Sequence, residues 1–149
     1  MTEVKISELS AASAVTPDDL FVIVDDPTGS PVTKKVSASL LRNPHVVAIA
    51  YAATLSTDAA SGDIFDITLT DNCTLANPTN PVDGKTLRWR ITQDGTGGRS
   101  VTLDSAFNLP ASATSPLPFS TAANKMDVLA ATYHAGRDKW DVVAFVMGY

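Results

Sequence analysis

The chain has 149 residues, of which 44% are hydrophobic and 18% charged, a composition typical of a folded domain rather than of a disordered segment. The formal net charge of −5 argues against nucleic-acid binding, because contact with phosphates needs a basic surface. No apolar run reaches the length of a membrane span and no secretory signal is evident, so we expect no membrane insertion and synthesis in a reducing cytoplasm. The single cysteine, Cys73, excludes an internal disulfide and a multi-cysteine zinc site.

Residues 1–43 are predicted to form a small module of their own. Its first part has Ile6 and Leu9 as its early apolar anchors and is expected to be an extended arm. The apolar, β-branched run 20–24 and the segment 32–36 are separated by dense turn-forming residues, and together they predict a β-hairpin.

A short helix is expected to follow this hairpin over residues 37–42, capped by Ser37 and ended before Pro44. A hairpin with one or two helical turns buries too little apolar surface to fold well by itself. We therefore expect this module to dock on the rest of the chain or on a partner.

Residues 44–149 are predicted to form an antiparallel β-sandwich or barrel of the jelly-roll type, which makes the chain all-β. Apolar and polar residues alternate clearly over 65–69 and 87–92, as expected for half-buried strands. A glycine-rich segment at 94–98 indicates a hairpin turn. The predicted strands cover 46–55, 65–75, 87–92, 101–109, 127–134 and 140–147.

Two of these strands, 46–55 and 140–147, carry apolar residues on both faces, which a strand facing water would not tolerate. The second face is covered either by the N-terminal module or by another subunit, and the residues leave both alternatives open. The candidate docking and interface residues are Ile6, Leu9, Leu20, Phe21, Ile23, Val46, Ala48, Ala50, Val143, Phe145 and Met147.

No constellation of residues in the sequence points to catalysis or to metal binding. His45 lies at the junction of the modules and His134 precedes a turn, so neither has an evident nucleophile beside it. The aspartates lack the ligand spacing of a calcium loop, and Cys73 follows the buried parity of its neighbours. We therefore expect a non-enzymatic protein with no catalytic residue, no cofactor and no metal site.

For two tryptophans and two arginines of the alternating strands, the sequence allows more than one role. Trp89 and Trp140 could form a stacking platform for a sugar, but their apolar neighbours of the same parity favour core packing. Arg88 and Arg90 point to the opposite side from Trp89. There they could pair with strand aspartates, either across the sheet or across a subunit boundary.

Several segments resemble structural proteins of tailed-bacteriophage particles. Residues 5–9, 19–25 and 33–40 look like a short N-terminal module of tail fibres and tailspikes. The residues that are similar to a β-rich domain of the same class are 75–84, 87–94, 121–129 and 139–144.

The resemblance implies a virion structural protein that attaches through its N-terminal module and assembles as a homotrimer alongside other virion proteins of the head or tail. Fibres and tailspikes usually continue for hundreds of residues. We therefore expect this chain to be a short fibre, a head decoration protein or a small tail component, made in the host bacterial cytoplasm. The alternative is a receptor- or carbohydrate-binding module that contacts a host surface glycan through aromatics such as Tyr133 or Tyr149.

Overall fold

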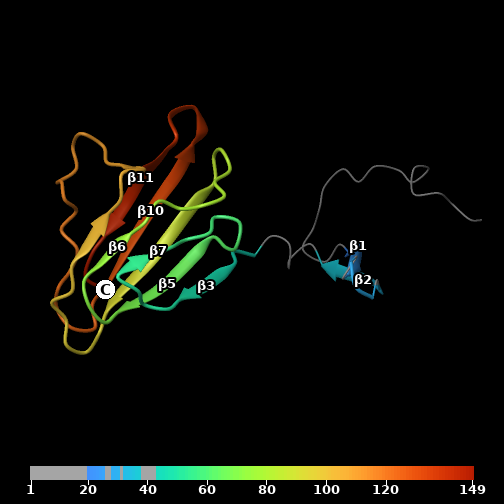
Figure 1. Ribbon diagram of the computed structural model, residues 1–149, viewed down its shortest axis with the longest axis horizontal. Coiled ribbons are helices and arrows are strands. Elements are labelled where there is room, and N and C mark those ends of the chain that lie inside the picture. The colour runs from blue at the N-terminus through green and yellow to red at the C-terminus, as the bar shows by residue number, and fades with distance from the viewer. Residues whose placement is uncertain (1–19, 26–27, 31, 38–42) are drawn as a thin grey trace, which may run out of the picture. The chain divides into compact units, whose positions relative to one another are not determined.

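The computed structural model describes residues 20–25, 28–30, 32–37 and 43–149 (Figure 1). The chain divides into two compact units, Met1–Asn43 and Pro44–Tyr149. The expected N-terminal arm, with Ile6 and Leu9, and residues 38–42 of the expected helix lie outside the described residues, as does the side chain of Leu20.

The described part of the first unit is an antiparallel pair of strands, β1 (Leu20–Asp25) and β2 (Val32–Ser37). Phe21 lies opposite Val36, which is buried, whereas Phe21 and Ile23 are 40% and 41% exposed. A two-stranded sheet is marginal in water because it cannot cover both of its faces. This unit therefore presents apolar side chains at its surface.

The second unit is all-β and consists of a six-stranded and a three-stranded sheet (Figure 1). The order of the larger sheet is β3-β5-β7-β10-β11-β9, and that of the smaller sheet is β4-β6-β8. A short 3-10 turn, Ala135–Arg137, connects β10 to β11. The strands are β3 (Val46–Ile49), β4 (Thr54–Leu55), β5 (Ile64–Leu69), β6 (Cys73–Leu75), β7 (Thr86–Gln93), β8 (Val101–Leu103), β9 (Phe107–Asn108), β10 (Met126–His134) and β11 (Lys139–Val146).

The strands from β3 to β8 alternate between the two sheets along the chain, so the chain winds from one sheet to the other and back. This part, residues 46–103, is called the coil. Within each sheet the coiled strands pair in parallel: β3 with β5, β5 with β7, β4 with β6, and β6 with β8. In the larger sheet the pairs β7–β10 and β10–β11 are antiparallel. The last strand of this sheet, β9, pairs with β11 in parallel.

This topology differs from the antiparallel jelly-roll arrangement that the sequence predicts. The alternation of apolar and polar residues identifies the buried face of each strand, but it is the same for parallel and antiparallel neighbours. The segment 46–55 is divided as well, since β3 ends at Ile49 and β4 begins at Thr54 in the other sheet.

The core lies between the two sheets and is centred on Trp89. The rings of Phe107 and Trp140 approach Trp89 edge-on, with centroids at 5.4 and 6.2 Å, and the ring of Phe65 stacks at 6.4 Å. The indole Nε1 of Trp89 donates a hydrogen bond of 3.0 Å to Oγ1 of Thr57, which is also fully buried. Both tryptophans are therefore core residues and offer no stacking platform for a sugar.

A β-bulge in the last strand pair changes which residues of β11 face the core. Ala130 pairs with Ala144 while Ala131 pairs with Val142, so Val143 is the extra residue. Beyond the bulge Phe145 points inward and packs edge-on against Phe119, with ring centroids 4.8 Å apart. Simple alternation over 140–147 would have placed Phe145 and Val143 together on one face, and the bulge separates them.

Two buried polar side chains fasten loops to the larger sheet. The carboxylate of Asp127 accepts the backbone N–H groups of Ser120 at 2.6 Å and of Gly148 at 2.9 Å. The side-chain amide of Gln93 donates to the carbonyl oxygens of Arg99 and Ser120, both at 2.8 Å. These bonds fix the end of the loop 110–120 and the C-terminal residues beside β10.

The substitution Thr57→Val tests the central hydrogen bond. Valine keeps the volume of threonine but leaves the buried N–H of Trp89 without an acceptor, so we expect a loss of about 1–3 kcal/mol in the free energy of unfolding. The matched control Thr68→Val, at an exposed position of β5, should change it by no more than about 0.5 kcal/mol. Urea titrations of the two variants check this, and equal losses would contradict it.

Candidate interaction surfaces

The outer face, which is the side of the six-stranded sheet that points away from the core, is formed by five neighbouring strands. Figure 1 shows β3, β5, β7, β10 and β11 side by side. The strand register aligns the outward side chains in rows across the sheet. One row contains Val46, Ile64, Arg88, Ala130 and Ala144, and the next contains Ala48, Asp66, Arg90, Val128 and Val146.

Apolar side chains occupy seven of the ten positions in these two rows, all on the strands to either side of β7, whose own outward residues are polar. Val46 on β3 and Val146 on β11 are each 45% exposed, and Ala48 and Ala144 are exposed as well. Groups of exposed apolar residues of this kind mark interaction sites in soluble proteins, whereas single exposed residues do not. The outer face is therefore the leading candidate for contact with another protein.

The sequence-predicted interface residues are distributed over several surfaces. Val46 and Ala48 belong to the outer face, and Ala50 is exposed just beyond β3. Val143, in the bulge, and Met147 are 61% and 47% exposed. Phe145 is half-buried against Phe119, so its role in the folded unit is packing rather than the display of an exposed surface.

Three members of the outer face, Ile64, Val128 and Ala130, were not singled out from the sequence. Each is an apolar residue at an outward position of its strand, where the alternation of apolar and polar residues would place a polar one. That departure from alternation is the signal that could have identified them. It becomes visible only when the strands are known to be neighbours.

The outer face also carries two arginines in contrasting surroundings. Arg90 holds Asp66 through two bonds, from Nε to Oδ1 and from a terminal nitrogen to Oδ2, the second at 2.6 Å. This is the pairing across the sheet that the sequence allows. Arg88 is exposed, and its guanidinium has no bonding partner within the described part of the chain.

The carboxylate of Asp63, which lies near Arg88, is already engaged. It accepts the backbone N–H of His45 at 2.9 Å and forms an ion pair of 3.2 Å with Nζ of Lys85. These contacts hold the pKa of Asp63 below its ordinary value, with the His45 N–H as the largest cause. Arg88, Asp63 and Ile64 line a shallow hollow of about 190 Å³ beside the outer face.

A second hollow, of about 240 Å³, lies between β8 and the loop that follows β9. Asp104 and Ser105 contribute polar groups to it, and the carbonyl oxygen of Ser105 accepts a bond of 2.9 Å from Nζ of Lys139. Its apolar lining is otherwise suited to a small ring or an apolar side chain. The apolar residues of its wall include Val101, Leu103, Phe107, Leu109, Leu117 and Phe119.

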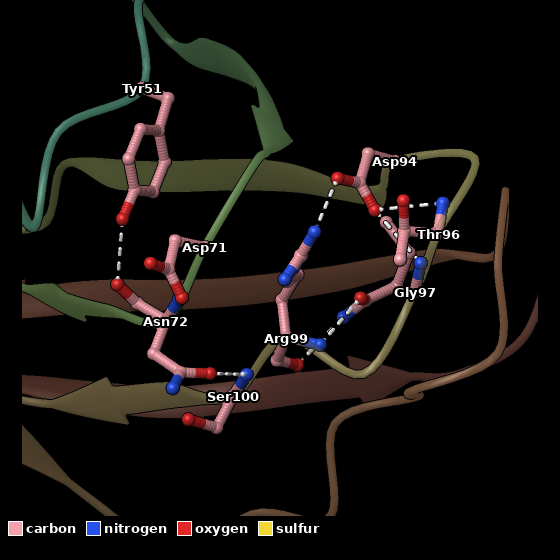
Figure 2. A network of polar contacts seen from close by, with 9 residues as sticks. Tyr51, Asp71, Asn72, Asp94, Thr96, Gly97, Arg99 and Ser100 are labelled. Atoms are coloured by element: carbon pink, nitrogen blue, oxygen red, sulfur yellow. Dashed lines mark hydrogen bonds and ion pairs between the residues drawn. The ribbon is translucent and has the colours of Figure 1, made fainter.

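A polar network joins the coil to the turn before β8 (Figure 2). The hydroxyl of Tyr51 donates to the carbonyl oxygen of Asn72 at 2.8 Å, and Oδ1 of Asn72 accepts the N–H of Ser100, also at 2.8 Å. Burial is the largest cause that raises the pKa of Tyr51, followed by the charge of Asp71. These bonds connect three segments that are distant in sequence, so this network is structural.

The turn itself is held by Asp94. Figure 2 shows the guanidinium of Arg99 directed at its carboxylate, at 2.9 Å, while the other carboxylate oxygen accepts the N–H of Gly97 at 2.8 Å. Gly97 has a φ of +71°, and a Cβ there would come within 2.6 Å of the carbonyl oxygen of Thr121. Glycine is therefore required at this position.

Acid should weaken this turn. The pKa of Asp94 is lowered from its ordinary value of 3.8, first by the bond from Arg99 and then by the Gly97 N–H. A lowered pKa in the folded state stabilises the fold above pH 4, and this contribution is lost as the pH falls below that value. Asp94→Asn keeps an acceptor for Gly97 but removes the charge. We expect its melting temperature to lie below that of the wild type at pH 7 and the difference to shrink at pH 3. A difference of the same size at both pH values would contradict this account.

Among the described residues, the histidines and the cysteine lie in separate places. Within the described ranges, no three metal-ligating side chains lie together. His45 and His134 are both exposed. His45 directly precedes β3, whereas His134 is the last residue of β10. Burial raises the pKa of the Cys73 thiol, which makes it a poor nucleophile. No helix in the described part of the chain is long and apolar enough to cross a membrane.

A comparison with protein families finds one match that covers more than half of the chain. The family described as "Putative phage tail fibre C-terminal domain" matches residues 52–138, a segment that contains the whole three-stranded sheet and β5, β7, β9 and β10 of the larger one. The chain belongs to this family. It is accordingly a structural component of a phage tail and so part of a virion, which confirms the resemblance seen in the sequence. Neither a search of curated proteins nor a search of solved structures found a match.

Proposed function

We propose that this protein builds part of a phage tail by associating with copies of itself through the outer face and by attaching to the particle through its N-terminal unit. The role is mechanical and non-enzymatic, because assembly depends on apolar contact rather than on reacting groups. The family match favours a short fibre or small tail component over a head decoration protein. Synthesis in the host cytoplasm is consistent with the buried, free thiol of Cys73.

The outer face is the observation that carries the self-association. It presents apolar side chains on the strands to either side of β7, from Val46 on β3 to Val146 on β11, and burial of such surface stabilises a complex by roughly 25 cal/mol per Å². A homotrimer is the assembly that the resemblance to tail fibres implies. A stable contact of this type should bury about 1,500 Å² or more in total.

The first unit supports the proposed attachment through its exposed apolar residues. Phe21 and Ile23 lie two residues apart on β1, so they share one side of the two-stranded sheet, and both remain about two-fifths exposed. A hairpin with such a surface gains stability when another protein covers it. Other proteins of the virion are the proposed partners.

The alternative function is that of a receptor- or carbohydrate-binding module. The hollow of about 240 Å³ beside β8 favours it, because Phe107 and Phe119 could contact the face of a sugar ring while Asp104 could accept hydrogen bonds from hydroxyl groups. Of the two aromatics suggested by the sequence, Tyr149 is 64% exposed, whereas the hydroxyl of Tyr133 is bonded to Asp138. Binding to host cells or glycans that disappears in Phe119→Ala would support this alternative.

The substitution Val146→Asp tests self-association. A carboxylate at this position would have to be buried in the contact, so we expect the oligomer to dissociate into monomers while the chain stays folded. The matched control is Val82→Asp, which makes the same change at a loop residue that is 63% exposed and lies outside the outer face. Light scattering coupled to size exclusion gives the mass of each variant.

The expected result is an oligomer for the wild type and for Val82→Asp, and a monomer for Val146→Asp. An oligomer in all three would show that the outer face is not the contact. A wild type that stays monomeric at every concentration would overturn self-association of the free protein. Circular dichroism confirms that each variant is folded.

The substitution Phe21→Asp tests attachment through the first unit. It should leave the mass of the oligomer unchanged but reduce the amount of the protein that is incorporated into phage particles. Quantitative immunoblots of purified particles measure this, with Val82→Asp as the control. Normal incorporation of Phe21→Asp would contradict the proposed attachment.

A further inference from the structure

We propose that Arg88 orients the contact between copies by binding a carboxylate of a second copy of this chain. The inference rests on the proposed self-association through the outer face and adds to it a polar contact that fixes which copies fit together and in what orientation.

Arg88 lies between apolar residues of the two neighbouring strands on the outer face. Its neighbours in the same row are Ile64 on β5 and Ala130 on β10, and Val46 lies one strand further. The side chain is exposed, and within the described residues no group bonds its guanidinium. Arg90, two residues later on the same side of β7, has its guanidinium paired with the carboxylate of Asp66 through two bonds.

A second copy that covers the row from Val46 to Ala144 also covers Arg88 and removes water from its guanidinium. Removal of a charge from water is strongly unfavourable unless an opposite charge with good hydrogen-bond geometry replaces the water. The two nearby carboxylates of the same chain are occupied, Asp63 by His45 and Lys85 and Asp66 by Arg90. The missing acceptor therefore has to come from the partner.

The partner's chemistry follows from this requirement. A guanidinium presents parallel N–H donors that match the two oxygens of a carboxylate, and the hollow of about 190 Å³ beside Arg88 offers space for an acidic side chain. The chain has 16 acidic and 11 basic residues, so a second copy has carboxylates to spare. Exposed aspartates that form no ion pair in the described segments, and that lie away from Val82 and Arg137, include Asp58 and Asp71.

The test compares Arg88→Glu, Arg88→Lys and Arg137→Glu with the wild type by analytical ultracentrifugation over a range of concentrations. Arg88→Glu should weaken association at least about 10-fold, because it places two carboxylates against each other. Arg88→Lys, which keeps the charge but loses the paired donors, should have an intermediate effect. Arg137→Glu makes the same change of charge at the exposed turn after β10 and should associate like the wild type.

Charge reversal identifies the acceptor. In the Arg88→Glu chain, the additional change Asp58→Arg or Asp71→Arg should restore association when it inverts the true pair, and such a rescue would establish direct contact.

Two failures are distinguishable. If Val146→Asp is monomeric but Arg88→Glu associates as tightly as the wild type, the role of Arg88 is wrong and self-association through the outer face stands. If the wild type itself is monomeric at every concentration, self-association fails and the inference about Arg88 fails with it. Unchanged melting curves show that the variants remain folded.

Discussion

The packing around Trp89 is the interaction on which the rest of the second unit depends. Its ring is where the coil (through Phe65), the edge strand β9 (through Phe107) and the last strand (through Trp140) meet. Aromatic contacts of this kind add to the gain from burial because edge-on and offset geometries are favourable. The bond to Thr57 satisfies the one polar group of the indole and anchors the segment between β4 and β5.

This arrangement has a consequence for the surface. The bulky aromatic residues of the larger sheet point inward, and several outward positions of β3, β5, β10 and β11 carry small and medium-sized apolar residues. A parallel coil that is buried on both faces reads as apolar on both faces. Within the second unit the coil is covered on one face, and we propose that a second copy covers the other.

The two arginines of β7 illustrate how position in the sheet separates structural from interacting charges. Arg90 is neutralised within the chain because Asp66 stands directly beside it in the parallel register of β5 and β7. Arg88, in the neighbouring row, faces Ile64 and Ala130 instead. The same residue type, two positions apart on one side of one strand, thus has a partner in one case and lacks one among the described residues in the other.

The sequence by itself determined the buried residues of the regular strands, the all-β character and the phage tail fibre family. Alternation places Phe65, Ile67 and Trp89 on the inner side of the sheet, and these side chains are buried. The alternation predicts burial correctly wherever a strand is regular. The tertiary structure decided the parallel pairing of β5 with β7, the inward turn of Phe145 after the bulge at Val143, and the different surroundings of Arg88 and Arg90. A pattern with period two records the face of a side chain but neither the direction nor the register of the neighbouring strand. Those depend on contacts between residues far apart in the chain, and the candidate surface exists only once they have formed.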